Sequence, residues 1–198
     1  MLVEISGQPA STLVDYASVP IAFEVRERLA VRARNNGIGG LELVPELVDP
    51  PYVKDYDAGS TNRPAAWAQR FDISRWGIFA AHAGAERVGG AVVVWNTPGV
   101  DMLEGRADLA VLWDLRVAPS HRGRGIGTEL FRAAETWATA RGAQWIKVET
   151  QNVNVPACRF YLGQGCVLGA IHRFAYPALP DEVQLLWYKR LAVAAISG

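Results

Sequence analysis

The sequence predicts a fold of the α/β (α+β) class, in which a sheet carries helices on its faces. Strand-like and helix-like patterns alternate along the chain, around one glycine-rich loop at residues 122–127. The 198 residues suit a single domain, and half of them are apolar, which is enough for a buried core. We therefore expect one domain over residues 1–198, of which residues 1–37 are the less certain part.

Composition argues against several classes of function. The 20 basic and 20 acidic residues cancel, whereas nucleic-acid-binding proteins usually carry a basic excess. No apolar run approaches the roughly 20 residues of a membrane span, and the N-terminus lacks the pattern of a signal peptide. The two cysteines and three histidines are scattered, so neither a disulfide framework nor a metal site is expected. These features predict a cytoplasmic protein with no metal and with no membrane or nucleic-acid partner.

The N-terminal quarter carries weak signals. Residues 2–5 alternate like a short strand. Residues 23–31 suggest a second extended piece, although residues 24–33 fit a helix equally well. Residues 41–48 alternate up to Pro45, which predicts a strand that breaks there.

A polar loop is expected over residues 52–64. It is either a plain solvated loop or one wall of an acceptor pocket, because loops often carry specificity. Residues 64–70 suit a helical turn with proline at its first position. Two apolar strands follow, at residues 76–81 and 88–95, and the short turn between them predicts a β-hairpin.

The stretch from Ala110 to Ala140 is the most informative part of the chain. Residues 110–117 form an apolar run broken only by Asp114 and Arg116, which is typical of a mostly buried strand. From Thr128 onward, apolar residues recur every three or four positions, which predicts a helix. The stretch therefore reads as a strand, a glycine-rich loop and a helix.

The loop in this stretch favours an anionic ligand. Its glycines let the backbone approach a ligand closely, and a helix start offers amide N–H groups without intrahelical partners. A phosphate or pyrophosphate suits that arrangement. The P-loop pattern fails for want of a lysine, and the dinucleotide pattern fails because Thr128 stands where a glycine is needed. What is present is Arg122-x-x-Gly125-x-Gly127, and for this loop alone a plain glycine-rich turn remains an alternative.

The chain beyond residue 142 continues the alternation of strands and helices. Residues 145–150 alternate as a strand, and Asn154 can cap a short helix at residues 157–162. Two further strands are expected, at residues 166–174 and 182–190.

A second motif sharpens the interpretation of the glycine loop. The run Asn154-x-x-Ala157-x-x-x-Tyr161-x-x-x-Gly165, taken together with the glycine loop, resembles the GCN5-related N-acetyltransferase (GNAT) superfamily. Within it, the segments VETQNVNVPACRFYLGQGCVLGAIHRFAYP and EVQLLWYKRL are similar to the streptothricin N-acetyltransferase group. The resemblance covers about residues 38–191. It departs from the group at Cys166, where an aromatic residue is expected.

The resemblance implies a mixed, mostly antiparallel central sheet and a definite chemistry. We expect transfer of acetyl from acetyl-CoA to a primary amine of a small molecule, such as a streptothricin-like antibiotic, with no metal. A homodimer is left open. The residues expected to bind the cosubstrate lie at the strand end, in the glycine loop and in the second motif: Leu115, Val117, Arg122, Gly123, Arg124, Gly125, Ile126, Gly127, Thr128, Asn154 and Ala157.

Three side chains are candidates for catalysis. The resemblance implies that Tyr161 is the general acid that protonates the departing thiolate; the alternative is a core tyrosine. Asp114, as the first candidate, or Glu149, as the second, would bind the ammonium group and lead its proton to water. Asp114 is a charge in an apolar strand, so its burial needs a reason, which could equally be a structural pair with Arg116 or Arg122. Glu149 could instead form a salt bridge or face solvent.

Two other functions remain open at this stage. A protein or peptide amine acetyltransferase would need an open acidic groove in place of a closed pocket. A non-catalytic acyl-CoA-binding module would lack the acid or the carboxylate, whereas Tyr161, Asp114 and Glu149 are all present.

Overall fold

A computed structural model describes residues 2–59 and 62–192 of the chain. These residues form two compact units. The described residues of the first unit are 2–22, 55–59, 62–147 and 190–192, and those of the second are Phe23–Lys54 and Val148–Lys189. The prediction of a single domain over residues 1–198 stays a prediction.

The strands form a large, mostly antiparallel sheet and a separate ribbon. The order in the seven-stranded sheet is β1-β4-β5-β6-β7-β9-β8, and β2 pairs with β3. The strands of the sheet, in that order, are Glu4–Gln8, Gly77–Ala83, Glu86–Trp95, Leu109–Val117, Trp145–Gln151, Gln184–Arg190 and Val167–His172. The pairs β1–β4, β4–β5, β5–β6 and β8–β9 are all antiparallel. The predicted fold class is therefore confirmed.

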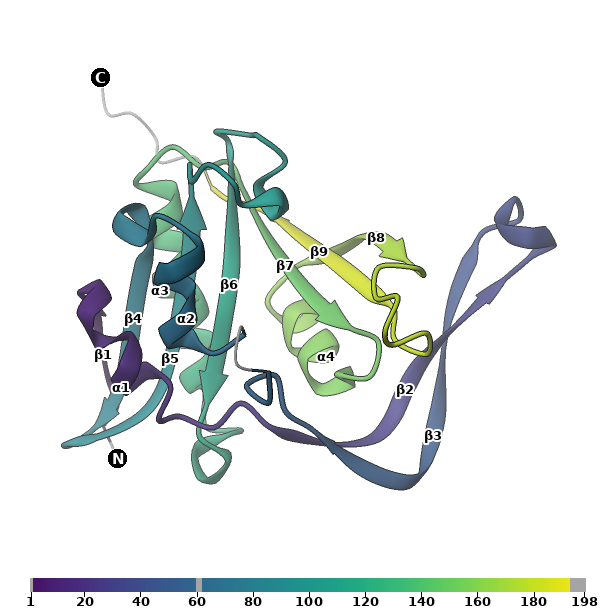
Figure 1. Cartoon of the computed structure of the whole chain (residues 1–198), viewed down its shortest axis with the longest axis horizontal. Coiled ribbons are helices and arrows are strands. Elements are labelled where there is room, and N and C mark those ends of the chain that lie inside the picture. Colours follow the sequence, from purple (N-terminus) through teal and green to yellow (C-terminus); the bar gives the residue numbers. More distant parts are fainter. Residues whose placement is uncertain (1, 60–61, 193–198) are drawn as a thin grey trace. The chain divides into compact units, whose positions relative to one another are not determined.

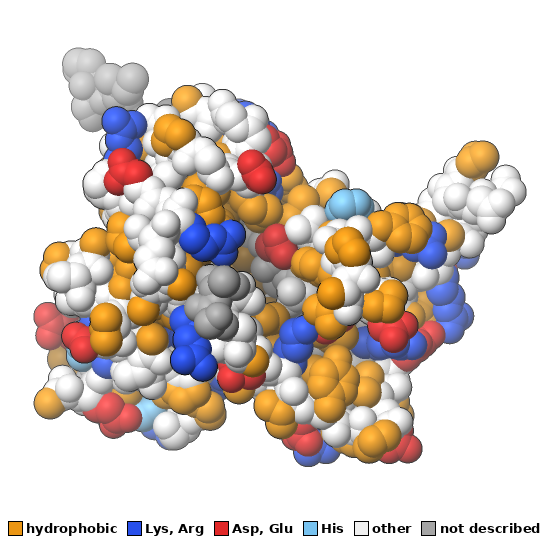
Figure 2. All heavy atoms as spheres, in the orientation of Figure 1, with side chains coloured by type: hydrophobic (Ala, Val, Ile, Leu, Met, Phe, Trp, Pro, Cys, Tyr) orange, Lys and Arg blue, Asp and Glu red, His pale blue; other side chains and the backbone are white. Residues whose placement is uncertain are grey.

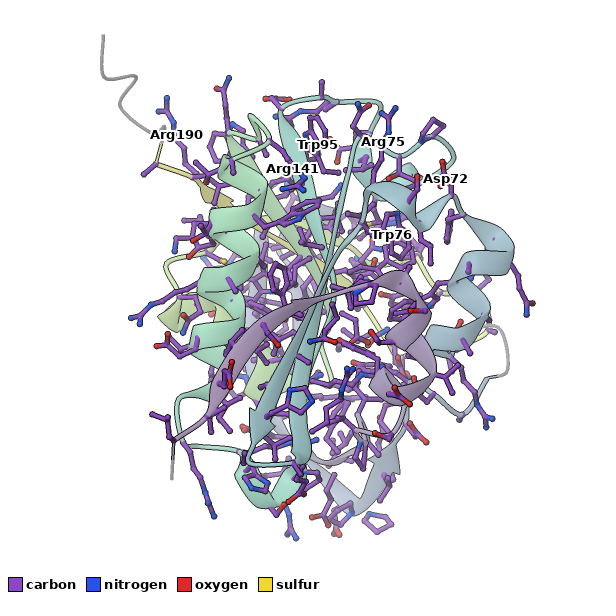
Figure 3. The ribbon with its side chains drawn as sticks, turned by 90° about the vertical axis from the view of Figure 1, so that its left-hand side faces the viewer. Asp72, Arg75, Trp76, Trp95, Arg141 and Arg190 are labelled. Carbon is purple, nitrogen blue, oxygen red and sulfur yellow. The ribbon has the colours of Figure 1, made fainter. Side chains whose placement is uncertain are left out.

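Helices cover both faces of the sheet in the first unit. The helix α3 (Ile126–Thr139) lies on one face, and α1 (Leu13–Tyr16) and α2 (Pro64–Arg70) lie on the other, as Figures 1 and 3 show. Short 3-10 turns connect these elements, at η1 (Ala10–Thr12), η2 (Asn35–Gly37), η3 (Ile73–Arg75), η4 (Asp101–Leu103) and η5 (Pro119–His121).

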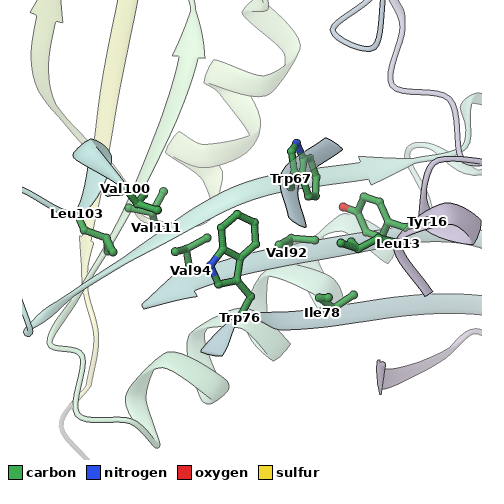
Figure 4. Packing of buried hydrophobic residues seen from close by; sticks show 10 residues of the cluster. All are labelled: Leu13, Tyr16, Trp67, Trp76, Ile78, Val92, Val94, Val100, Leu103 and Val111. Atoms are coloured by element: carbon green, nitrogen blue, oxygen red, sulfur yellow. The ribbon is translucent and has the colours of Figure 1, made fainter. Parts of the chain in front are cut away.

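The core beneath α1 and α2 is strongly aromatic. The rings of Tyr16 and Trp67 lie 6.1 Å apart, and those of Trp76 and Trp113 lie 5.4 Å apart. Aliphatic side chains of the sheet, of α1 and of the η4 turn complete the packing, as Figure 4 shows: Leu13, Ile78, Val92, Val94, Val100, Leu103 and Val111. Large buried rings contribute much of the hydrophobic stabilisation of a small core.

The opposite face of the sheet packs against one stripe of α3. The buried residues of this helix are Ile126, Leu130, Phe131, Ala134 and Ala138, which recur at helical spacing. The predicted hairpin of residues 76–95 is confirmed as β4 and β5, and the helix begins two residues earlier than the predicted Thr128.

One irregularity in β6 changes which side chains share a face. Val92 pairs with Asp114 while Val93 pairs with Leu112, so Trp113 is an extra residue in the ladder. Such bulges bend a strand and break its alternation. Trp113 packs in the aromatic core, and the neighbouring Asp114 accepts a hydrogen bond from Tyr16 of the same core.

The second unit contains the ribbon of β2 (Phe23–Ala33) and β3 (Leu41–Lys54), together with α4 (Val155–Gly163). The helix that residues 24–33 could have formed is not present, and the predicted break at Pro45 is wrong, because Pro45 pairs with Leu29. Both strands are edges, so the missing N–H of a proline can face away from the ladder. The strand β3 also takes the first three residues of the predicted loop at 52–64.

The described surface carries both signs of charge. Figure 2 shows acidic and basic side chains interspersed on one face, in keeping with a formal net charge of zero. Within the described residues, no helix is long and apolar enough to cross a membrane.

Candidate functional site

The glycine loop of the first unit leaves the start of α3 without a side-chain cap. Gly125 occupies the N-cap position at φ 82°, and the first bond within the helix runs from Glu129 N to Gly125 O at 3.2 Å. The N-terminus of α3 therefore presents the amides of Ile126, Gly127 and Thr128, at the end where the helix dipole favours an anion.

The glycines of the loop serve its conformation and its access. Gly123 and Gly125 have φ angles of 74° and 82°, in the left-handed region that other residues rarely adopt. A Cβ atom built on either residue would meet no other atom within 4 Å. The space beside the backbone is open, so close packing is not what requires a glycine here.

The two arginines of the loop differ in their surroundings. Arg122 donates from Nε to the Val117 oxygen at 3.0 Å and from Nη2 to the Ala22 oxygen at 3.1 Å. Burial lowers the pKa of this guanidinium. Both arginines are exposed, and Arg122 ties the loop to the end of β6. The remaining candidates on β6, Leu115 and Val117, are half-buried.

Asp114 lies in a cluster with Tyr16, Asp57 and Arg116, here called the Arg116 cluster. Its Oδ1 accepts from the Tyr16 hydroxyl at 2.5 Å and from Arg116 Nε at 2.9 Å, and its Oδ2 accepts from Arg116 Nη2 at 2.7 Å. Arg116 also donates to Asp57 Oδ2 at 2.7 Å and to the Val19 oxygen at 3.2 Å. The Asp114–Arg116 pair, one alternative left open by the sequence, is therefore present.

Burial makes the Arg116 cluster electrostatically strong. The side chain of Arg116 is 1% exposed and that of Asp114 is 8% exposed. Burial, followed by the negative charge of Asp114, raises the pKa of Tyr16 well above its ordinary value. Burial disfavours the charge of Arg116, but the bonds to Asp114 and Asp57 outweigh it and raise the pKa of the guanidinium. Tyr16 is therefore a hydrogen-bond donor to Asp114, and Asp114 is ion-paired with Arg116, which it shares with Asp57.

The second motif folds as a strand, a tight turn and α4 in the second unit. Asn154 occupies the N-cap, and its side-chain oxygen accepts from the Ala157 amide at 3.2 Å. Pro156 sits in the first turn, where its missing N–H does no harm. The helix cap predicted for Asn154 is confirmed, and Ala157 is the donor to that cap.

Glu149, on β7, differs from Asp114 in its partners. Its Oε1 accepts from the Tyr176 hydroxyl at 2.5 Å, and its Oε2 accepts from Gln184 Nε2 at 2.8 Å. Both donors are neutral groups of the same unit. Within residues 2–59 and 62–192, no guanidinium or ammonium group bonds to the carboxylate of Glu149.

Tyr161 lies on α4 with 6% of its surface exposed. Its ring centroid is 5.1 Å from that of Phe160, in an edge-on arrangement. On the same helix, Cys158 is buried beside Thr150, and burial raises the pKa of its thiol. A thiol held in its neutral form is a poor nucleophile, so Cys158 is not a candidate for catalysis.

Sequence reasoning missed several residues that organise these sites. Asn152 is 2% exposed, donates to the Leu29 oxygen at 3.0 Å and accepts from the Val183 amide at 2.8 Å. Tyr16 and Asp57 contact partners that lie far away in the sequence. Of Tyr16, Asp57 and Asn152, only Asp57 lies in a segment that the sequence singled out, the predicted polar loop at residues 52–64.

The described residues contain no group of three or more histidine, cysteine or acidic side chains that could hold a metal ion.

Comparison with known proteins identifies the family. Residues 41–165 match the acetyltransferase (GNAT) family. The chain is 39% identical over 171 residues to a streptothricin acetyltransferase of Escherichia coli, covering 84% of each protein.

Solved structures agree with the sequence comparison. A nourseothricin acetyltransferase is similar in fold, with a TM-score of 0.76 and 23% identity over 97% of this chain and 100% of that one. A structure described as a streptothricin acetyltransferase from Bacillus anthracis str. Ames, in complex with acetyl coenzyme A, gives a TM-score of 0.72. It is 25% identical over 97% of this chain and 99% of that chain.

Proposed function

Because this chain belongs to the acetyltransferase (GNAT) family, we propose that it transfers acetyl from acetyl-CoA to an amine of a streptothricin-like antibiotic. The observation that carries the proposal is the uncapped start of α3 behind Gly123 and Gly125, which fits a diphosphate. Identity over most of the chain to a streptothricin acetyltransferase supports the acceptor class.

The first requirement of this reaction is a cradle for the diphosphate of the cosubstrate. The amides of residues 123–128 supply hydrogen-bond donors, and the partial positive charge of the helix start adds to them. Arg122 fixes the loop through two backbone oxygens, and the exposed Arg124 contributes positive charge. Acetyl-CoA supplies the acyl group as a thioester.

The second requirement is a neutral amine. An alkyl ammonium with a pKa near 10.4 must lose a proton before its nitrogen can attack a carbonyl carbon. We assign the removal of that proton to Glu149, because its bonded partners are neutral and its full charge can attract the ammonium. Asp114 is the second candidate. It is bound through both carboxylate oxygens to the buried Arg116, which also pairs with Asp57, and this fixed position suits it better to holding the strand.

The third requirement is a proton for the thiolate that leaves. We assign this donation to the Tyr161 hydroxyl. A tyrosine with an ordinary pKa near 10 is protonated at neutral pH and can protonate a thiolate. The amine nitrogen thus gains the acetyl carbon, the carbon–sulfur bond breaks, and the sulfur receives the proton.

An acceptor screen tests the proposal. Purified protein with acetyl-CoA should release free thiol in the presence of streptothricin, and the antibiotic should gain the mass of one acetyl group. A lysine-containing peptide and a neutral sugar serve as matched acceptors and should release little thiol. Release that is faster with the peptide would overturn the assignment of the acceptor, and no release with any amine would overturn the function.

A further inference from the structure

The ribbon of β2 and β3 is bonded to the rest of the second unit only near its base. There, Leu29 exchanges hydrogen bonds with Asn152, and Glu27 forms an ion pair with Arg159. Among the described residues, the hydrogen bonds and ion pairs of residues 30–45 stay within the ribbon. Figure 1 shows this part ending in the turn between the two strands, away from α4.

One face of the ribbon is apolar. The register pairs Leu29 with Pro45, Val31 with Leu43 and Ala33 with Leu41. Paired residues of antiparallel strands share a face, and the faces alternate along each strand. The apolar ribbon face therefore consists of seven side chains: Leu29, Val31, Ala33, Leu41, Leu43, Pro45 and Leu47. Leu41 is 40% exposed and Leu47 is 89% exposed, so this face is open to solvent.

The opposite face of the ribbon is charged, and its charges are matched within the ribbon. The Nη2 atoms of Arg28 and Arg32 each lie 3.4 Å from a carboxylate oxygen of Glu46. At the turn, Arg34 Nη2 lies 3.8 Å from Glu42 Oε2. No charged residue stands among the seven of the apolar ribbon face, so its partner must be selected by apolar contact.

A ribbon of this kind needs a second layer. An isolated pair of strands is marginally stable in water and gains stability when its apolar side is covered. Within β2 and β3, Val25 is the one buried residue, and it lies at the base of the ribbon. The outer part of the ribbon therefore leaves apolar area in water that association could remove from it.

We propose that the apolar ribbon face packs against the same face of a second copy of this chain, about a two-fold axis. Such an interface is self-complementary, because both copies contribute the same neutral surface. The charged faces of both ribbons stay in water, where their ion pairs remain as they are. The partner is therefore another molecule of this protein.

Charge argues against the other symmetric arrangement, in which the ribbons pair edge to edge. Pairing β3 with its copy would place Glu42 and Glu46 of both chains on one face of a single sheet. Pairing β2 with its copy would do the same with Arg28 and Arg32. Like charges on neighbouring strands are destabilising, so packing face to face is favoured.

The size of the surface sets the strength of the dimer. Seven side chains from each copy are fewer than the roughly 20–30 residues a side of a standard interface. The dimer should therefore be weak and reversible, with a dissociation constant of roughly 10–100 μM.

Sedimentation of the full chain tests the proposal. The mass should rise from 21.6 kDa towards twice that value between about 1 and 300 μM protein. Leu43→Arg places a charge in the apolar ribbon face and should weaken the dimer about 100-fold, because both copies carry it. A chain that stays monomeric at about 300 μM would overturn the proposal.

The matched control is Val44→Arg, at the next residue of the same strand. Val44 is also half-buried, but it pairs with Ala30 on the charged face. This variant adds the same side chain and should dimerise as the unaltered chain does. Equal dimerisation of the two variants, strong or weak, would contradict the assignment of the face. Thermal unfolding of both variants verifies that they are folded.

Hydrogen exchange of the unaltered chain provides a test without any variant. Amides of residues 30–33 and 41–44 should exchange more slowly at about 300 μM than at about 1 μM protein, whereas those of β4 and β5 should not change. A dimer that forms without this protection would place the interface elsewhere and overturn the proposal. Neither experiment uses acetyl-CoA, so such a result leaves the proposed function standing.

Discussion

Two strand–turn–helix connections of this chain differ in how the N-terminus of the helix is capped. Between β6 and α3, Gly125 occupies the N-cap and offers no side-chain bond. Between β7 and α4, the side chain of Asn154 accepts from the Ala157 amide. The first turn has no side-chain cap, and we propose that the diphosphate binds there, whereas the second satisfies an amide with its own side chain. The same local architecture therefore supports two different tasks.

The carboxylates on the two strands differ in a corresponding way. Asp114, on β6, bonds to a buried guanidinium, whereas Glu149, on β7, bonds to a hydroxyl and an amide. The first unit thus has backbone N–H donors at the start of α3 and a carboxylate that is ion-paired with an arginine. The second unit has Glu149 and Tyr161, to which we assign the proton transfers. The comparison suggests that binding of the cosubstrate depends on the backbone of the first unit and that proton transfer depends on the second.

The largest expected effect follows from placing a side chain at Gly125, in the turn between β6 and α3. Gly125→Val places a branched side chain at φ 82°, in the space where the diphosphate is proposed to lie. Affinity for acetyl-CoA should fall by about 100-fold or more, since one charge-assisted contact alone is worth roughly 1.5–3 kcal/mol and several are lost. Isothermal titration calorimetry measures this directly.

The control for that variant is Gly142→Val, at the other end of the same helix. Gly142 has φ 87°, and a Cβ atom there would also meet nothing within 4 Å. Both variants should lose about 1–3 kcal/mol of stability through backbone strain, but only Gly125→Val should lose cosubstrate affinity. Equal losses of affinity would mean that the helix as a whole, and not its open start, determines binding.

A smaller effect is expected from the phenol of the second unit. Tyr161→Phe removes the hydroxyl and keeps the ring that packs on Phe160. Its kcat should fall by about 10²-fold, at the lower end for loss of general acid catalysis, with acetyl-CoA affinity unchanged. Steady-state kinetics with streptothricin would separate the two quantities. An unaltered kcat would leave Tyr161 as a core residue.

The two carboxylates can be distinguished by paired amides. Glu149→Gln should lower kcat/KM by about 10²-fold, at the lower end for loss of general base catalysis, with little change in stability. Asp114→Asn should instead destabilise the chain by about 3 kcal/mol, because it disturbs a buried ion pair. Kinetics and urea unfolding of both variants provide the comparison. The opposite pattern would transfer the base role to Asp114.

The sequence predicts the local parts of this molecule well. The strand, loop and helix of residues 110–140 depend on neighbouring residues, as do the cap by Asn154 and the β4–β5 hairpin, and all of these are confirmed. The family is confirmed because its motifs are also local runs.

Contacts between distant residues could not be predicted in the same way. Tyr16 bonds to a residue 98 positions away, and Asn152 joins Leu29 and Val183, which lie 123 and 31 positions from it. No period or motif encodes such pairs. The strand through Pro45 was missed for a related reason, since the pairing of β2 with β3 overrides the local signals.

A modest effect should come from removing the cap of the second turn. Asn154→Ala leaves the Ala157 amide without its side-chain acceptor and should lower stability by about 1 kcal/mol. Because α4 carries Tyr161, kcat should fall more than acetyl-CoA affinity does. Chemical denaturation and kinetics test both statements, and Asn154→Asp, which can still cap the helix, should recover the stability. A cosubstrate affinity that falls as far as in Gly125→Val would contradict the contrast between the two turns.

The smallest effect concerns the pH dependence of stability in the two units. The pKa of Tyr16 is raised by burial and by Asp114, so the folded chain keeps this proton when the unfolded chain loses it near pH 10. The free energy of unfolding should therefore fall as the pH rises above about 10, by up to about 1.4 kcal/mol per pH unit for this group. Tyr16→Phe removes the group. It should be less stable than the unaltered chain at neutral pH, and the difference should narrow at high pH.

Burial also raises the pKa of Tyr52 in the second unit, but that residue is 41% exposed. In Tyr52→Phe, the difference in stability from the unaltered chain should therefore change less with pH. Urea denaturation between about pH 8 and 11 measures these slopes. Parallel slopes in Tyr16→Phe and the unaltered chain would mean that Tyr16 ionises as freely in the folded state as in the unfolded one. The contrast between the buried, ion-paired Asp114 and Glu149 would then lose its support.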